Sequence, residues 1–184
     1  MIVKDFAGRR PWFRRLGRLQ IRREIAAYRW LEGVPGVPAF VGRVDPLALA
    51  IECIDGERLR SAALRPEDGP RHVAQLRAIL DAIHARGVVH NDLRGSENAL
   101  LRRDGGLAVI DFAGAMRLRP GGIAHRLLFR LLAVADEAAF LKWKGLIAPG
   151  SYTREDEAFL RRFERWRVLW PFNPKRRKAK SRVA

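Results

Sequence analysis

Apolar side chains recur at two kinds of spacing along the chain, and each kind predicts a different element. Two stretches, residues 19–32 and 71–86, carry apolar positions three and four residues apart, which is the spacing of one face of a helix. Gly87 follows the second stretch as a helix stop. The members of these faces are Ile21, Ile25, Tyr28 and Leu31 in the first helix, and Val73, Leu76, Ile79, Leu80 and Ile83 in the second.

Short apolar runs bounded by turn residues predict strands before, between and after these helices. Glycine and proline at 33–38 end the first helix, Asp45-Pro46 marks a turn, and Asp104-Gly105-Gly106 marks a tight turn between two strands. The predicted strands lie within residues 1–5, 39–45, 47–56 and 107–110, with a shorter one at 88–89.

Breakers and polar runs predict the connections. Residues 6–20 are basic and contain Gly8, Pro11 and Gly17, so we expect a connection there that leads into the first helix. Residues 61–70 read as a polar linker.

Helical spacing returns in the C-terminal part of the chain. Dense apolar positions from Gly121 to residue 146 predict a small helical lobe, which Pro149-Gly150 ends. Thr153 and Asp156 have the spacing of a capping-box variant at the start of a further helix. Phe159, Phe163, Trp166 and Trp170 give that helix an aromatic stripe.

Length and composition limit the classes of protein. The 184 residues suffice for one domain, or one domain of two small lobes, and 48% of them are apolar. No apolar run reaches the roughly 18 residues that span a bilayer, and MIVKDF lacks the apolar core of a signal peptide. One cysteine, Cys53, excludes an internal disulfide and a multi-thiolate zinc site, so a cytoplasmic protein is expected.

The formal net charge is +16, which indicates an anionic partner such as a nucleotide, a phosphorylated substrate, a membrane surface or nucleic acid. The alternative is that the arginines simply lie on solvated faces. Residues 171–184 contain no acid and are predicted to be a disordered basic tail. Aromatic side chains beside that tail favour peripheral contact with the inner face of an anionic membrane, and nucleic acid is the competing partner. A solvated tail with no partner is the other alternative.

The segment from Val88 to Phe112 carries the candidate chemistry, because it holds His90, Asp92, Asn98 and Asp111 between apolar strands. A carboxylate at Asp92 can accept the proton of an attacking hydroxyl. The amide oxygen of Asn98 and the carboxylate of Asp111, at the end of a buried strand, suit Mg²⁺.

Two neighbours in this segment have roles of their own. Arg94 could place a guanidinium near a transferring phosphate, so it joins Asp92 as a candidate catalytic residue. His90 is expected to be structural, packing beneath the loop and bonding backbone carbonyls.

The pair of motifs HNDLRGSEN and IDFAG resembles the catalytic and metal-binding loops of the protein-kinase-like superfamily. The asparagine stands one residue later than in most protein kinases, and the longer loop is similar to that of small bacterial RIO-type serine/threonine kinases and lipopolysaccharide-core (Kdo/heptose) sugar kinases. The resemblance implies an α+β, minimal bilobal fold with a truncated N-terminal sheet lobe and a mostly helical C-terminal lobe. It also implies ATP and Mg²⁺ as cofactors.

The same resemblance implies roles for residues outside the motifs. Lys4 would bind the nucleotide phosphates, Glu24 would pair with Lys4, and Glu52, Cys53 and Ile54 would form the hinge that binds adenine. An ordinary strand end is the alternative for that hinge segment. The implied organisation is a reduced N-terminal lobe over residues 1–56, a C-terminal lobe over 57–170 and the basic tail over 171–184.

The predicted activity is ATP-dependent transfer of the γ-phosphate to a hydroxyl acceptor. The acceptor is either a serine or threonine of a protein, which the RIO-like resemblance favours, or a sugar of a lipopolysaccharide core or another lipid-linked glycan. No Gly-rich phosphate loop precedes Lys4, and no Ala-Pro-Glu follows Asp111. A catalytically inactive pseudokinase that binds anionic membrane or RNA is therefore the alternative of another class.

Overall fold

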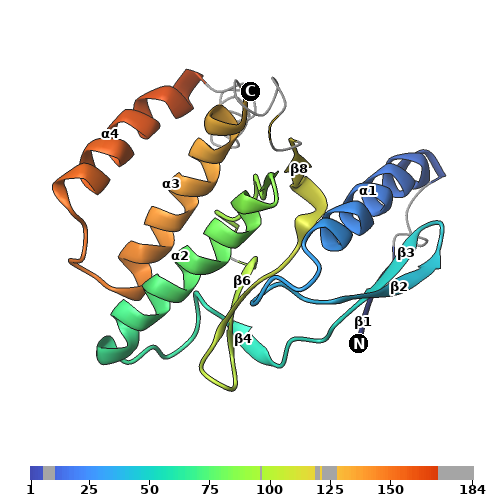
Figure 1. Cartoon of the computed structure of the whole chain (residues 1–184), viewed down its shortest axis with the longest axis horizontal. Helices are drawn as coiled ribbons and strands as arrows, with labels where there is room; N and C mark the ends of the chain where they lie inside the picture. The colour runs from blue at the N-terminus through green and yellow to red at the C-terminus, as the bar shows by residue number, and fades with distance from the viewer. Residues whose placement is uncertain (6–10, 96, 119–120, 122–127, 170–184) are drawn as a thin grey trace, which may run out of the picture.

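The structure is a computed structural model, and it describes residues 1–5, 11–95, 97–118, 121 and 128–169. The predicted basic tail at 171–184 lies outside these residues, as does most of the stretch from 119 to 127. Over the described residues, the chain forms a small sheet with one helix near its N-terminus, followed by a larger, mostly helical part (Figure 1).

The N-terminal part consists of three strands and one long helix. β1 (Ile2–Asp5), β2 (Phe40–Asp45) and β3 (Ala48–Ile51) form an antiparallel sheet in the order β1-β3-β2. Lys4 lies opposite Leu49 of the central strand β3, all four residues of which are buried. The helix α1 (Pro11–Trp30) lies over this sheet (Figure 1).

The predicted start of the first helix was wrong. α1 begins at Pro11, so the residues from 11 onward are helical and do not form the expected connection. Proline is well tolerated in the first turn of a helix, where its missing N–H has no partner in any case. Gly17 lies inside the helix, where a glycine costs only about 1 kcal/mol relative to alanine. The apolar face from Ile21 to Leu31 is buried as predicted.

A second sheet and a strand pair form the centre of the C-terminal part. β4 (Gly56–Arg58), β6 (Ala99–Arg102) and β7 (Leu107–Val109) are antiparallel in the order β4-β6-β7, and β5 (Val88–Val89) pairs with β8 (Met116–Arg117). The predicted turn at Asp104-Gly105-Gly106 is confirmed, since Arg102 N donates to Gly106 O at 2.8 Å.

One part of the strand prediction needs correction. The expected strand over 47–56 ends at Ile51, residues 52–55 are irregular, and Gly56 begins a separate strand. Gly56 approaches β6 so closely that a Cβ there would lie 2.3 Å from Leu101 O, which only glycine permits. The segment between β3 and β4 therefore connects the two sheets and does not extend the first.

Three helices pack together in the C-terminal part: α2 (Gly69–Ala85), α3 (Arg130–Ile147) and α4 (Arg154–Leu169), which lie side by side in Figure 1. Short 3₁₀ turns at Pro66–Asp68 and Phe112–Gly114 complete the elements. The predicted capping box is confirmed, because Asp156 N donates to Thr153 Oγ1 at 3.2 Å and Thr153 N donates to Asp156 Oδ2 at 2.9 Å.

One apolar core joins the two parts, with Ile21, Leu49, Leu80 and Trp143 among its fully buried members. None of the helices in the described ranges is long and apolar enough to cross a membrane. The predicted α+β class is confirmed, and the arrangement of small antiparallel sheets and four helices is consistent with a minimal bilobal kinase-like fold.

Candidate active site

Lys4 brings together two acids that are far apart in the sequence. Its Nζ donates to Glu24 Oε1 at 2.6 Å and to Asp111 Oδ1 at 2.8 Å. Glu24 lies on α1 and its side chain is fully buried, whereas the side chain of Asp111 is 40% exposed. The predicted pairing of Lys4 with Glu24 is thus present, and Asp111 joins it.

The charges in this cluster shift one another's protonation. Burial lowers the pKa of Lys4, but the carboxylates of Glu24 and Asp111 outweigh burial, and the net pKa is raised above its ordinary value. Burial raises the pKa of Glu24, and Lys4 offsets part of that rise. Burial also acts to raise the pKa of Asp111, yet the hydrogen bond and charge of Lys4 bring it below its ordinary value. Lys4 and Asp111 are both charged at neutral pH.

Two aromatic side chains position these acids. Tyr28 follows Glu24 by one helical turn, and its ring meets the ring of Phe112 edge to face at 5.3 Å between centroids. Phe112 is fully buried and directly follows Asp111. Asp111 has φ = 65°, the left-handed conformation that is uncommon outside glycine, and its Oδ1 accepts from Ala113 N at 3.4 Å. Tyr28 thus packs α1 against the residue that follows Asp111.

The loop between β5 and β6 carries the other two predicted groups. Asn98 Nδ2 donates to Asp92 O at 2.8 Å and to Asp92 Oδ2 at 3.2 Å, so the two side chains are in contact. Ile110 N donates to Asn98 O at 3.0 Å, which places Asn98 beside the residue that precedes Asp111. Asn98 and Asp111 thus lie at the same end of the β6–β7 hairpin.

The donor set at this end of the hairpin fits Mg²⁺. Asn98 donates to Asp92 through Nδ2, so its Oδ1 is not the atom used in that contact, and the carboxylate of Asp111 is partly exposed. Both are hard oxygen ligands, and Mg²⁺ is commonly held by one or two such groups together with waters and substrate phosphates. In the described part of the chain, no group of three or more histidine, cysteine, aspartate or glutamate side chains is placed to hold a metal ion.

His90 is structural, as predicted. The side chain is fully buried and its ring packs on Phe112 at 4.8 Å between centroids. Asp92 N donates to His90 Nδ1 at 3.3 Å, so Nε2 carries the proton and donates to Ile110 O at 3.0 Å. His90 thereby ties the backbone at Asp92 to the strand that leads to Asp111.

Sequence reasoning missed Asp136, which organises the backbone of this loop. Asp136 lies on α3, is fully buried, and accepts from His90 N at 2.7 Å and from Asn91 N at 2.8 Å. His84 Nε2 of α2 lies 3.0 Å from the same carboxylate. Asn91 has φ = 63°, and the bond from its N–H holds that unusual conformation. No periodic signal in the sequence indicated this role, because Asp136 lies within a largely apolar segment.

Two further residues of α3 bind the same loop. Trp143 Nε1 donates to Leu93 O at 2.8 Å, and Lys142 Nζ donates to Arg94 O. The backbone from His90 to Arg94 is therefore bound at several successive positions by one helix.

The side chain of Arg94 lies against α4. Its guanidinium is 5.3 Å from the centroid of the Phe163 ring, and Nη2 lies 3.7 Å from Glu164 Oε1. The contact predicted between Arg94 and a transferring phosphate stays a prediction.

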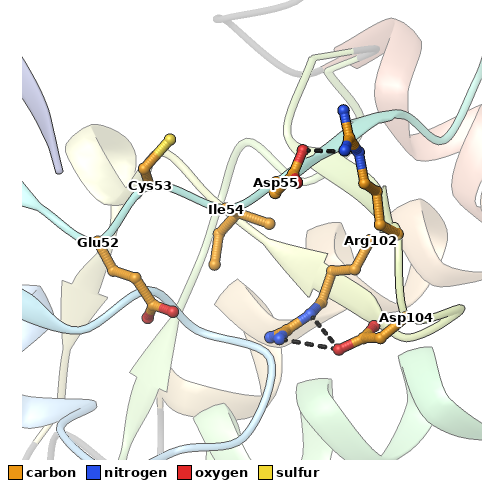
Figure 2. A pocket seen from close by; sticks show the side chains of 7 residues that line it. Glu52, Cys53, Ile54, Asp55, Arg102 and Asp104 are labelled. Carbon is orange, nitrogen blue, oxygen red and sulfur yellow. Dashed lines mark hydrogen bonds and ion pairs between the residues drawn. The ribbon is translucent and has the colours of Figure 1, made fainter.

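The predicted hinge residues border a pocket of about 250 Å³. Glu52, Cys53, Ile54 and Asp55 form one wall of it, and the turn at 102–104 forms the other (Figure 2). Glu52 N donates to Ala39 O at 2.8 Å, and Glu52 Oε2 accepts from Ala39 N at 3.0 Å. The cluster around Lys4 does not line this pocket, and the role of the hinge residues in adenine binding stays a prediction.

No protein-family model matches the chain. The chain is 34% identical over 122 residues to CBL-interacting serine/threonine-protein kinase 16 of Arabidopsis thaliana. The aligned region covers 62% of this chain and 26% of that protein. It is also 34% identical over 116 residues to the putative CBL-interacting protein kinase 27 of Oryza sativa subsp. japonica, covering 58% of the chain and 28% of the relative. CBL-interacting protein kinase 12 of the same rice is 39% identical over 71 residues, 37% of this chain and 13% of the relative.

The chain therefore spans about a quarter of the length of the first two relatives. Over the matched residues the chain is similar to protein kinases, and the fold is consistent with a minimal bilobal kinase-like arrangement. The finer resemblance to RIO-type or lipopolysaccharide-core kinases stays a prediction.

Proposed function

We propose that the chain is an ATP-dependent phosphotransferase that moves the γ-phosphate to a hydroxyl group, and that it acts as a serine/threonine protein kinase-like enzyme. The observation that carries the proposal is the bridge from Lys4 to Glu24 and Asp111, at 2.6 and 2.8 Å. Phosphoryl transfer depends on positioned charge more than on covalent chemistry by the protein, and this bridge gathers such charge beside the Asp92 loop.

Each group has a chemical task that its surroundings support. Lys4 binds phosphate oxygens, while the buried Glu24 holds the ammonium in place. Asp92 is exposed at the loop surface and accepts the proton of the attacking hydroxyl. Asn98 and Asp111 would hold Mg²⁺, which neutralises negative charge on the phosphates. Arg94 directs the acceptor, and Glu52, Cys53 and Ile54 bind the adenine.

The acceptor we favour is a serine or threonine hydroxyl, because the relatives described above are named as serine/threonine-protein kinases or protein kinases. A sugar of a lipopolysaccharide core or another lipid-linked glycan is the alternative acceptor, which the basic and aromatic residues near the end of the sequence favour.

The test is Mg²⁺-dependent turnover of ATP, and autophosphorylation, by the wild type and by the variant Asp92→Asn. We expect the variant to lose at least about a hundredfold in turnover, the usual contribution of a general base. Asp81→Asn is the matched control, since Asp81 is an exposed carboxylate on α2. Equal turnover by the wild type and Asp92→Asn would overturn the role of Asp92.

A second candidate is a catalytically inactive pseudokinase that binds an anionic surface, either the inner face of a cytoplasmic membrane or RNA. The observation that favours it is the exposure of Arg161, Arg162 and Arg165 along α4, in a chain of net charge +16. A thermal-shift titration with Mg-ATP distinguishes the two. No shift with nucleotide, together with salt-sensitive binding to anionic liposomes or RNA, would favour this candidate over the enzyme.

A further inference from the structure

Two polar atoms buried beside Lys4 have no hydrogen-bond partner among the described residues, namely Oε2 of Glu24 and the hydroxyl oxygen of Tyr28. Glu24 is fully buried and Tyr28 is 1% exposed, so bulk water does not reach either group. A buried polar atom without a partner destabilises the folded state, and the great majority of buried polar atoms in proteins are paired. Two such atoms at one site therefore call for a common explanation.

The two atoms belong to neighbouring side chains of α1. Tyr28 follows Glu24 by four residues, which places both side chains on the same face of the helix, one turn apart. Burial raises the pKa of the Tyr28 hydroxyl, the negative charge of Glu24 raises it further, and the nearby backbone of Asp111 opposes part of the rise. The hydroxyl is thus protonated at neutral pH and can donate a hydrogen bond.

The packing of Tyr28 does not require its hydroxyl. The ring meets the ring of Phe112 edge to face at 5.3 Å between centroids, and phenylalanine could make the same contact. The carboxylate of Glu24 likewise uses one oxygen, Oε1, to accept from Lys4 Nζ at 2.6 Å. Each side chain therefore brings to this site one polar atom that these contacts do not use. A hydroxyl donor and a carboxylate acceptor are complementary.

A single water molecule has enough polar partners here to join the two atoms. The ammonium of Lys4 has three N–H donors, of which one is directed at Glu24 and one at Asp111. Its third N–H and the Tyr28 hydroxyl can donate to the water, and Oε2 of Glu24 can accept from it. This agrees with the roughly three hydrogen bonds that a buried water makes in proteins.

We propose that Tyr28 is a positioning residue for Lys4. Its hydroxyl, through one bridging water, holds Oε2 of Glu24, and this keeps Oε1 turned toward the ammonium. The inference rests on the proposed phosphotransferase function, because Lys4 exchanges Asp111 for phosphate oxygens when the nucleotide binds. Glu24 then orients the ammonium alone, and a carboxylate held at both oxygens orients it better than one that can rotate about its last bond.

The first experiment measures the bond without any ligand. Tyr28→Phe keeps the ring and removes the hydroxyl, and its effect on urea unfolding is compared in the wild type and in Lys4→Met with Glu24→Leu, where neither charge of the pair is left buried alone. We expect the unfolding equilibrium constant to rise about tenfold in the wild type, the scale of a hydrogen bond to a charged group. In the second background it should stay unchanged or fall, because the hydroxyl has no carboxylate to hold there.

The sign of the effect in the wild type decides the proposal. An unchanged or lowered unfolding constant for Tyr28→Phe would overturn it, because the hydroxyl would then have no partner to lose. An equal rise in both backgrounds would overturn it too, because the partner would not be Glu24. Glu24→Gln is the alternative background if the double substitution does not fold, and there the effect of Tyr28→Phe should shrink to about threefold or less.

The matched control is Tyr152→Phe, which removes a hydroxyl that donates to Leu141 O at 2.8 Å. This bond joins a carbonyl of α3 and has no part in the contacts of Lys4. We expect Tyr152→Phe to raise the unfolding equilibrium constant by the same factor in both backgrounds. A dependence on background as large as that of Tyr28→Phe would overturn the assignment of Glu24 as the partner.

The second experiment separates the positioning of Lys4 from general stability. Equilibrium binding of Mg-ATP, and of adenosine, which lacks the phosphates, is measured by titration calorimetry. We expect Tyr28→Phe to weaken binding of Mg-ATP about tenfold and binding of adenosine by less than about twofold, while Tyr152→Phe changes neither. Equal weakening of both ligands by Tyr28→Phe, or of neither, would overturn the positioning role. Absence of Mg-ATP binding by the wild type would overturn the proposed function and the positioning role with it, whereas the unfolding comparison would still decide the bond to Glu24.

Discussion

Replacing Asp136 with asparagine tests whether α3 holds the loop that carries Asp92. The Asp136 carboxylate accepts from His90 N at 2.7 Å and from Asn91 N at 2.8 Å, one bond to each oxygen. His84 Nε2 lies 3.0 Å from the oxygen that His90 N binds. The side chain is fully buried, so water cannot replace a bond that the substitution removes.

The expected loss of stability follows from the hydrogen bonds that an amide can make at this position. Asparagine keeps one oxygen, and whichever way the amide turns, its NH₂ group faces a backbone N–H donor. A hydrogen bond to a charged group contributes about 1.5–3 kcal/mol, and loss of one partner from a buried charged pair costs about 3–5 kcal/mol. We therefore expect Asp136→Asn to lower the free energy of unfolding by about 2–4 kcal/mol.

The measurement is urea unfolding followed by tryptophan fluorescence, since Trp143 is fully buried on the same helix and donates to Leu93 O. The control is Asp81→Asn on α2, because Asp81 forms an exposed pair with Arg77 at 2.8 Å that contributes about 0.5 kcal/mol or less. His84→Gln provides a milder change at the same carboxylate in case Asp136→Asn does not fold.

Activity provides a second readout of the same substitution. Asp136 lies too deep to touch a substrate, so its loss should reduce ATP turnover by displacing the loop backbone at His90 and Asn91. A loss of stability below about 1 kcal/mol with turnover unchanged would refute the reasoning, since the loop would then be held without this carboxylate.

Three other substitutions address the cluster around Lys4 and the connection between the sheets. Lys4→Met leaves the buried Glu24 without its cation, so we expect a loss of about 3 kcal/mol in urea unfolding that the further change Glu24→Leu partly recovers; an undiminished stability would contradict the pairing. Asp111 has a lowered pKa in the folded protein, so its contribution to stability is present above its ordinary pKa of 3.8 and is lost as the pH falls through the lowered value. Asp111→Asn should therefore flatten this acid limb of the stability curve, and an unchanged limb would show that other carboxyl groups produce it. Gly56→Ala places a Cβ 2.3 Å from Leu101 O and should cost about 1–3 kcal/mol by thermal or urea unfolding, whereas Gly42→Ala, with no atom within 4 Å of its Cβ, should be nearly neutral; equal effects would remove the steric explanation.

The sequence predicted the elements that depend on periodicity and on turn residues. The buried face of α1, the β6–β7 hairpin and the capping box at Thr153 are local patterns, and the fold retains them. The start of α1 was missed because proline was read as a breaker, although it is compatible with the first turn of a helix. The end of β3 was missed because apolar residues recur as far as Ile54, while the strand register with β1 and β2 ends at Ile51.

The sequence identified those residues of the candidate site that belong to a recognisable motif. The proximity of Lys4 to Glu24 came from resemblance, because 20 residues separate them and no spacing rule joins a strand to a helix face over that distance. The orientation of Arg94 was not predictable, since Phe163 and Glu164 reach it from α4, about 70 residues later in the chain. Asp136 was passed over because a single acid in an apolar segment gives no periodic signal.

The contacts of α3 fix the backbone position of the loop that carries Asp92, and they leave the choice of acceptor to other residues. The backbone is held by Asp136, Lys142 and Trp143, which bind amide or carbonyl groups that any loop sequence would present. Of the side chains in the loop, those of His90 and Asn98 also bond its backbone, whereas the guanidinium of Arg94 lies against α4. Under the proposed function, a change at Arg94 alters which acceptor approaches Asp92 while the position of Asp92 itself is preserved. Residues that determine the acceptor should accordingly tolerate substitution in unfolding experiments, whereas Asp136 should not.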